Sequence, residues 1–204
     1  MHMNWIKTNE QPLSKKHISG EIIRVEMCKQ VNNGPPIFKG TTIIKSSLAR
    51  IAFVLTDIDS KKKWVNRLAA HSLIEGDIIG KEYTTFEHYN LAWPISDREY
   101  VLDAKWSLDL EIKEPTATLK ITSTTHPKHP LREDRVRGEL QKLVFRLKEI
   151  QPGITETIVE IKVDPKGKLP GFLANLIQKN WPVTTLRALN KEVLSGKDLH
   201  VLFT

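Results

Sequence analysis

The sequence contains a single cysteine, Cys28, so it cannot form an internal disulfide bond, and its redox compartment is left open. It also lacks an apolar run that approaches the roughly 20 residues needed to span a bilayer, and we therefore expect a soluble chain. There is no glycine-rich phosphate loop and no Gly-x-Ser-x-Gly pattern. These absences argue against nucleotide binding and against serine-hydrolase chemistry.

The overall composition is that of an ordinary globular protein, with 40% hydrophobic and 27% charged residues among 204. A chain of this length is expected to form one domain, residues 1–204. Met1-His2-Met3 resembles a cloning remnant, in which case a signal peptide could have been removed. We therefore expect a cytoplasmic location, or a periplasmic or secreted one if such a peptide was present.

The basic excess, a formal charge of +7, suits an anionic partner. Apart from Lys15-Lys16 and residues 61–63, the positive charges are scattered, which is also typical of a solvated surface. Nucleic-acid binding is disfavoured, because Trp64, Trp93 and Trp106 lie in apolar patterns and are expected in the core or a tunnel wall, whereas stacking platforms expose their aromatics. We expect a transient contact with an anionic membrane surface.

The last fifth of the chain is predicted to form one long helix. Asp164-Pro165-Lys166-Gly167 is a turn by composition, Leu169-Pro170 opens the helix, and Gly196 ends it. Pro182 should bend the helix. Apolar residues recur at helical spacing and form one wide face, which needs an apolar partner: Phe172, Leu173, Leu176, Ile177, Val183, Leu186, Leu189 and Val193.

Most of the chain before this helix has strand character. Two short helices interrupt it, one capped by Ser46 or Ser47 and ending near Asp57, the other capped by Asp59-Ser60 and running to Trp64 and Leu68. Residues 5–14 form a short helix or an extended lead-in. The predicted strands cover 20–29, 37–45, 78–89, 99–112, 116–125, 135–150 and 154–164. This order predicts an α+β fold in which a curved antiparallel sheet wraps around the C-terminal helix.

The clearest alternation runs from Glu99 to Ile112. A slip by one residue would place charges in the interior, so the pattern determines which side faces inward. A sheet curved enough to hold a helix leaves a gap typical of ligand pockets. The residues predicted to face inward are Tyr100, Leu102, Ala104, Trp106, Leu108, Leu110 and Ile112.

Two motifs then show a family resemblance. Residues 93–101, Trp-Pro-Ile-Ser-Asp-Arg-Glu-Tyr-Val, and residues 164–170 with Asn175 resemble signature sequences of START domains, the StAR-related lipid-transfer family. Lesser matches are Lys39-Gly40, Asp57, Trp64 and Val136-Arg137. The resemblance implies the helix-grip fold, which START domains share with Bet v 1-like proteins. It also implies an internal hydrophobic tunnel between sheet and helix that holds a lipid or another hydrophobic molecule.

The expected tunnel wall combines strand and helix residues, and one position departs from the family pattern. In several family members the sixth residue beyond the motif arginine, here Arg98, is a second arginine that meets a polar head group; here it is Ala104. That loss argues against a phosphate at this spot. His88 is the nearest candidate to touch a ligand hydroxyl or carbonyl, unless it is a core histidine paired with backbone. The predicted ligand-binding residues are Phe86, His88, Tyr100, Leu102, Ala104, Trp106, Leu173, Leu176, Ile177 and Val183.

Arg98 itself is expected to be structural and to hold the turn into its strand through Asp97 or Asp103. His126 and His129 are spaced as in zinc sites, but prolines interrupt the loop and no further ligand joins them, so we expect no metal.

We expect a monomeric, non-catalytic carrier without a cofactor, which binds and transfers a hydrophobic small molecule. The alternative is an enzyme of the polyketide cyclase or aromatase type, in which Glu82, Glu87 and His88 would act as acid and base.

Overall fold

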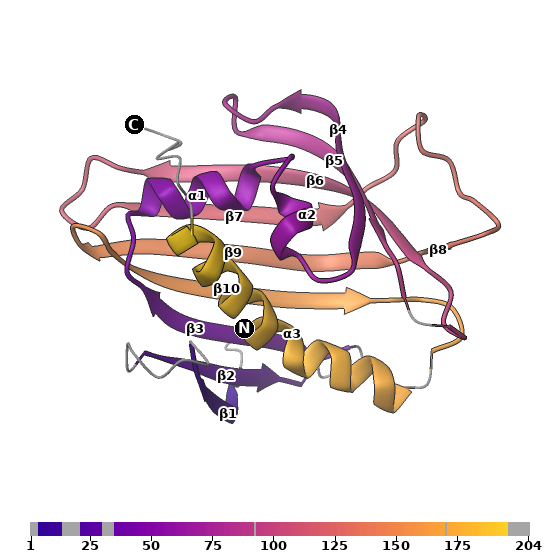
Figure 1. Ribbon diagram of the computed structural model, residues 1–204, viewed down its shortest axis with the longest axis horizontal. Coiled ribbons are helices and arrows are strands. Elements are labelled where there is room, and N and C mark those ends of the chain that lie inside the picture. Colours follow the sequence, from indigo (N-terminus) through magenta and orange to yellow (C-terminus); the bar gives the residue numbers. More distant parts are fainter. Residues whose placement is uncertain (1–3, 14–20, 30–34, 92, 170, 196–204) are drawn as a thin grey trace.

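The computed structural model describes residues 4–13, 21–29, 35–91, 93–169 and 171–195, and for residues 171–177 it describes the backbone alone. As the sequence predicts, most of the chain consists of strands, two short helices interrupt them, and a long helix comes last (Figure 1). They are β1 (Ile6–Pro12), β2 (Ile22–Cys28), β3 (Ile37–Ile44), α1 (Leu48–Thr56), α2 (Lys61–Trp64), β4 (Leu68–Asp77), β5 (Glu82–Tyr89), β6 (Arg98–Asp109), β7 (Thr116–Ser123), β8 (Val136–Arg137), β9 (Glu139–Gln151), β10 (Ile154–Asp164) and α3 (Gly171–Ser195).

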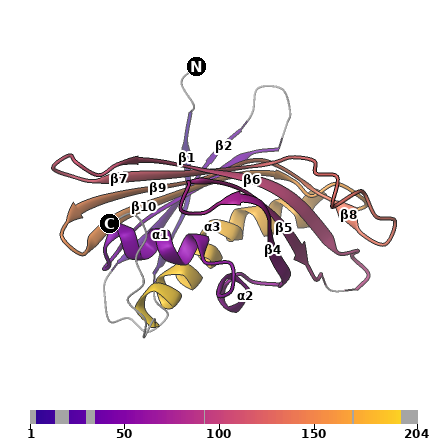
Figure 2. The same cartoon turned by 90° about the horizontal axis from the view of Figure 1, so that it is seen from above.

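The strands form one 10-stranded sheet in the order β1-β2-β3-β10-β9-β7-β6-β5-β4, with β8 paired to β6. All neighbours along this order are antiparallel, and only the short β6–β8 pair is parallel among the described strands. Figure 2 shows the sheet curving over α1, α2 and α3, which lie together on its concave side. The predicted α+β fold with a sheet wrapped around the last helix is confirmed.

α3 buries the face that its spacing predicts. Val183, Leu186, Leu189 and Val193 are all at most 7% exposed and belong to one core with residues of α1 and the sheet. Pro182 lies inside the helix, and the ribbon of α3 changes direction along its length (Figure 1). Leu173, Leu176 and Ile177 lie in the part of α3 whose side chains are not described.

Gly40 lets α3 approach the sheet closely. A Cβ atom at this position of β3 would lie 2.8 Å from the Cβ of Pro182 and 2.9 Å from Cδ1 of Leu186, closer than van der Waals contact allows. Gly40 therefore has a packing role: its missing side chain creates the space in which the middle of α3 lies.

The two short helices differ from prediction in one respect. α1 begins after Ser47, whose hydroxyl accepts a hydrogen bond from the N–H of Arg50 at 3.3 Å. α2 ends at Trp64, and the following Leu68–Asp77 is a strand, β4, which the sequence pattern missed. The pairing of β4 with β5 shifts twice, between Leu68 and Ala70 and between Leu73 and Glu75, so the alternation is broken.

Two smaller differences concern strand ends. The segment expected to be a short helix or an extended lead-in is extended, and it forms the edge strand β1, paired with β2. The strand predicted over 135–150 is divided into β8 and β9 at Gly138. A Cβ atom at Gly138 would lie 2.5 Å from the ring of Tyr100, so this glycine makes room for the tyrosine.

We predict that Gly40→Ala destabilises the fold by about 1–3 kcal/mol, because the added methyl group must push Pro182 and Leu186 away from the sheet. Urea unfolding of the two proteins measures the difference. Thr41→Ala is the matched control, since Thr41 lies next to Gly40 in β3 and points to the opposite face. Equal stability of Gly40→Ala and the wild type would show that α3 is not held against β3 at this point.

Candidate functional site

The interior face of β6 is arranged as the alternation predicts. Leu102, Ala104 and Trp106 are each at most 4% exposed and lie in the core, whereas Asp103 and Lys105 between them are exposed. Tyr100 is half-buried and packs against the same core. Their predicted position facing the helices is confirmed, and their contact with a ligand stays a prediction.

The prediction that Phe86 and His88 line this interior is wrong. Directly paired residues of antiparallel strands share one face of a sheet, and Phe86 pairs with Val101 while His88 pairs with Glu99. Both side chains therefore lie on the convex face. Their neighbours in β5 take the interior positions: Tyr83 opposite Ala104, Thr85 opposite Leu102, and Glu87 opposite Tyr100.

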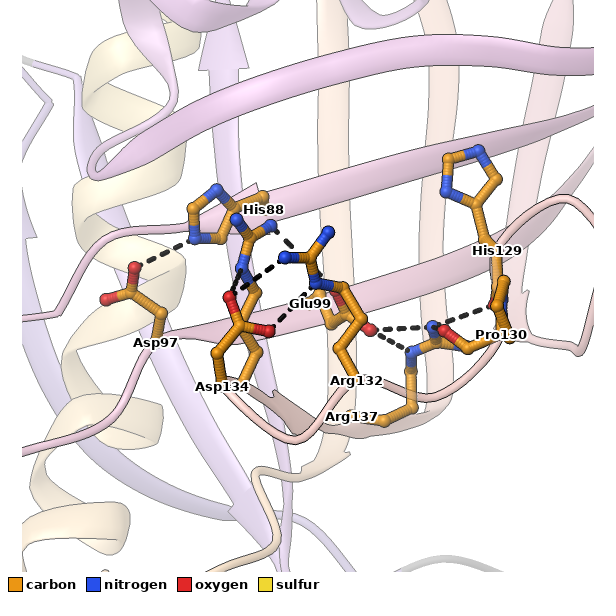
Figure 3. A network of polar contacts seen from close by, with 9 residues as sticks. His88, Asp97, Glu99, His129, Pro130, Arg132, Asp134 and Arg137 are labelled. Atoms are coloured by element: carbon orange, nitrogen blue, oxygen red, sulfur yellow. Dashed lines mark hydrogen bonds and ion pairs between the residues drawn. The ribbon is translucent and has the colours of Figure 1, made fainter.

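On the convex face Phe86 contacts the segment that connects β7 to β9, whereas His88 contacts Asp97, which lies just before β6. The Phe86 ring stacks on His129 with 4.4 Å between ring centroids, and Nε2 of His88 lies 2.8 Å from Oδ2 of Asp97. Glu99, 1% exposed, accepts two hydrogen bonds from Arg137, whose Nη2 also donates to the His129 carbonyl (Figure 3). This network anchors the connection to β5 and β6.

The interior instead contains a buried polar cluster, which we call the Glu87 cluster and define as Lys61, His71, Glu87 and Tyr89. Nζ of Lys61 lies 2.6 Å from Oε1 of Glu87, and the hydroxyl of Tyr89 donates to Oε2 at 2.6 Å. His71 pairs with Glu87 across β4 and β5, and its Nε2 lies 3.7 Å from Oε1 of Glu87. Three separate elements, α2, β4 and β5, thus contribute side chains that meet between α2 and the concave sheet.

Glu87 and Lys61 form an ion pair in a poorly solvated place. Burial alone would raise the pKa of Glu87, but the charge and hydrogen bond of Lys61 outweigh it, so the pKa lies below its usual value and the carboxylate is ionised. Burial and the charge of Glu87 raise the pKa of Tyr89, which therefore remains a donor.

His71 is neutral in this cluster. Burial, followed by the positive charge of Lys61, lowers its pKa to about 4. Nδ1 lies 3.3 Å from the carbonyl oxygen of Ile58, which can only accept, so Nδ1 carries the proton. Nε2 is then unprotonated and can accept a hydrogen bond, but no donor among the described residues lies within hydrogen-bond distance of it.

Arg98 joins the two family-like motifs. It is 3% exposed, and its guanidinium donates to the carbonyl of Pro165 at 3.2 Å, to that of Lys166 at 3.0 Å and to that of Ser96. The expectation that Arg98 is structural agrees with this position, but its partners are backbone carbonyls and not Asp97 or Asp103. The turn it holds leads directly into α3, and Lys166 and Gly167 there have positive φ.

Three further expectations concern Trp93, a metal site and a membrane-spanning helix. Trp93 is 92% exposed, so it does not belong to the core or to a tunnel wall. His126 pairs with Glu75, and among the described residues no three His, Cys, Asp or Glu side chains gather closely enough to hold a metal ion. Within the same residues, no helix combines the length and the apolar character needed to cross a membrane.

Several solved structures of known proteins share this architecture. No family model matches the chain. A human protein, STARD10, superposes with a TM-score of 0.78 at 19% identity over 94% of this chain and 73% of that one. Human StAR-related lipid transfer protein 5 gives 0.74 at 18% identity over 94% and 86%. A STAR-related lipid transfer protein of Xanthomonas axonopodis gives 0.72 at 22% identity over 93% and 98%.

In sequence, an uncharacterised protein of Pseudomonas aeruginosa is 27% identical over 161 residues, which cover 74% of this chain and 72% of that protein. The solved neighbours establish the class: this chain has the START fold, a helix-grip architecture, and the resemblance of its motifs is confirmed at the level of the fold.

We predict that His71 makes the protein acid-sensitive. The unfolded chain takes up a proton near pH 6.5 and the folded chain near pH 4, so stability present above pH 6.5 is lost as the pH falls between these values. From pH 7 to pH 5, the wild type should lose about 2 kcal/mol more than His71→Asn. Urea unfolding at both pH values measures this, and parallel pH profiles would contradict the buried neutral histidine.

We also predict that Arg98→Met lowers stability by about 2–4 kcal/mol, because three backbone carbonyls lose the charged donor that the buried guanidinium provides. Hydrogen exchange should rise first in the turn at residues 165–169. Arg132→Met is the control, since Arg132 forms an exposed ion pair with Asp134, and this variant should unfold like the wild type. Unchanged exchange in this turn would show that Arg98 does not hold the start of α3.

Proposed function

We propose that this protein binds a hydrophobic small molecule, such as a lipid, a sterol-like compound or an acyl compound, between the concave sheet and α3. The observation that carries the proposal is the apolar row of β6 on the concave side of the sheet, which belongs to one core with residues of α3, in a fold whose solved neighbours are described as lipid transfer proteins. Ala104 supports it further, because its small side chain takes little of the space between Leu102 and Trp106 on that face.

The ligand wall that we propose consists of residues on the concave side of the sheet and on the apolar face of α3. From the sheet it takes Tyr100, Leu102, Ala104 and Trp106, and from the paired strand Tyr83 and Thr85. From the helix it takes Val183, together with Leu173, Leu176 and Ile177, whose positions on the apolar spacing of α3 support the assignment. Phe86 and His88 are not part of it.

We further propose that the ligand enters and leaves by a displacement of α3. The helix follows a turn with two positive-φ residues, Lys166 and Gly167, and contains Pro182, so a few backbone rotations at these points would suffice. Arg98 keeps the turn closed through its carbonyl contacts. A sheet with continuous pairing would be harder to open.

Transfer between membranes is the role we propose for this binding, with the protein working as a monomer and meeting an anionic membrane surface transiently. The charge of +7 favours such a surface. Trp93 and Leu131, 92% and 77% exposed, supply the apolar contacts that membrane interfaces accept. Lys61 does not add to this surface charge, because it forms an ion pair with Glu87. Lys62 and Lys63 remain from that lysine run.

No observation favours the cyclase alternative. Glu82 is exposed and pairs with Lys105, Glu87 faces the interior, and His88 lies on the convex face. The three side chains that would act as acid and base are thus divided between two faces of the sheet. We propose a carrier without a catalytic role.

The test is to extract the purified protein with organic solvent and identify what is released by mass spectrometry, then to measure transfer of a fluorescent acyl probe between vesicles. We expect a co-purifying lipid, and probe binding weakened at least tenfold in Ala104→Trp, which fills the interior. Lys105→Trp, the next residue on the opposite face, should bind like the wild type. Identical binding by all three proteins, or conversion of the bound molecule, would refute this role.

The same assay tests the membrane contact. Transfer should be faster to anionic than to neutral acceptor vesicles, and the difference should shrink with salt as the Debye length falls to about 8 Å near physiological ionic strength. Equal transfer rates to both vesicle types would contradict the membrane contact and leave the basic surface with a role in solubility alone.

A further inference from the structure

The Glu87 cluster has more acceptors than donors. Each carboxylate oxygen of Glu87 receives one hydrogen bond, from Lys61 or from Tyr89, and an ionised carboxylate can accept about four. Nε2 of His71 is an additional acceptor with no donor among the described residues. The side chains of His71 and Glu87 are 1% and 5% exposed, so these acceptors lie in the interior.

Two of these acceptors face one another. Nε2 of His71 and Oε1 of Glu87 are 3.7 Å apart, a separation at which a single donor group can approach both. A buried acceptor without a donor is unfavourable, because it has given up its hydrogen bonds to water without replacement. A donor at this place would therefore be bound strongly.

The charge of the cluster restricts what that donor can be. Lys61 and Glu87 neutralise one another, so a charged ligand would place an uncompensated charge in a poorly solvated site. An ammonium group would meet Lys61, and a carboxylate or phosphate would meet Glu87. A neutral donor such as a hydroxyl group meets neither penalty.

The cluster also lies at one end of the proposed ligand wall. Glu87 is directly opposite Tyr100, and the interior row continues from there along β6 through Leu102 to Ala104. From Tyr100 to Ala104 the row extends about 13 Å at the rise of a β-strand. An apolar body could therefore lie along β6 while its polar end reaches His71.

We propose that His71 and Glu87 form a subsite that accepts a hydrogen bond from the hydroxyl group of a neutral lipid, a long-chain or polycyclic alcohol. This inference rests on the proposed carrier function and names its ligand class. Trp64 supports it: the residue lies one helical turn after Lys61, and its buried indole N–H has no acceptor among the described residues. A hydroxyl group can accept as well as donate.

The test compares probes that differ in one group: a long-chain alcohol with a pyrene at its far end, its methyl ether and the corresponding carboxylic acid at pH 8. The wild type should bind the alcohol about tenfold more tightly than the ether, as one hydrogen bond to a buried polar group predicts. The acid, ionised at this pH, should bind more weakly than the alcohol. This comparison needs no variant.

Two matched variants then locate the subsite. His71→Phe removes the free acceptor and should bring the alcohol-to-ether ratio close to one, with the ether bound as by the wild type. His88→Phe makes the same substitution on the opposite face of the neighbouring strand and should leave the ratio unchanged. Thermal unfolding confirms that each variant folds.

The possible outcomes distinguish a failure of the proposed subsite from a failure of the proposed carrier function. If the wild type binds alcohol and ether equally, or if the ratio survives in folded His71→Phe, the subsite is refuted while the carrier stands. Tighter binding of the acid than of the alcohol would likewise refute a neutral-donor site. If no probe binds, the proposed carrier function is refuted, and the subsite with it.

Discussion

Burial of one face of α3 against the concave side of the sheet is the interaction on which the rest of the structure depends. Each fully buried aliphatic side chain on that face contributes about 1.5–3 kcal/mol, and Leu186 and Leu189 are completely covered. The approach is possible because β3 carries Gly40 where the helix comes nearest. Arg98 then determines where the helix begins, by holding the carbonyls of Pro165 and Lys166.

The interior that this packing creates is not uniformly apolar. The Glu87 cluster places an ion pair and a neutral histidine beside the aliphatic and aromatic row of β6. Replacing a buried ion pair by apolar residues is often neutral or stabilising, so stability alone is a weak reason for its presence. A role in recognising a polar group of the ligand accounts both for its position at the end of that row and for the acceptor that His71 leaves free.

Strands β5 and β6 are covered on both faces near Glu99, and this explains why the site was only partly predictable. Val101 and Glu99 are buried on the convex face because the connection from β7 to β9 lies over them, held by Arg137 and by the Phe86–His129 stack. With both faces covered, the alternation of polar and apolar residues in β5 no longer indicates the interior. Phe86 thus resembles a core residue, while the interior position belongs to Glu87.

The sequence by itself determined the order of most elements, the α+β class, the START-like motifs, the inward register of β6 from Leu102 to Trp106 and the buried stripe of α3. These follow from local periodicity and capping, which a one-dimensional pattern records. Three features were decided by the tertiary structure alone. The first is the strand β4, whose register shifts break its alternation. The others are the partners of Arg98 and the assembly of Lys61, His71, Glu87 and Tyr89. Those features depend on which face another segment covers and on contacts between residues far apart in the chain, and neither is encoded in local spacing.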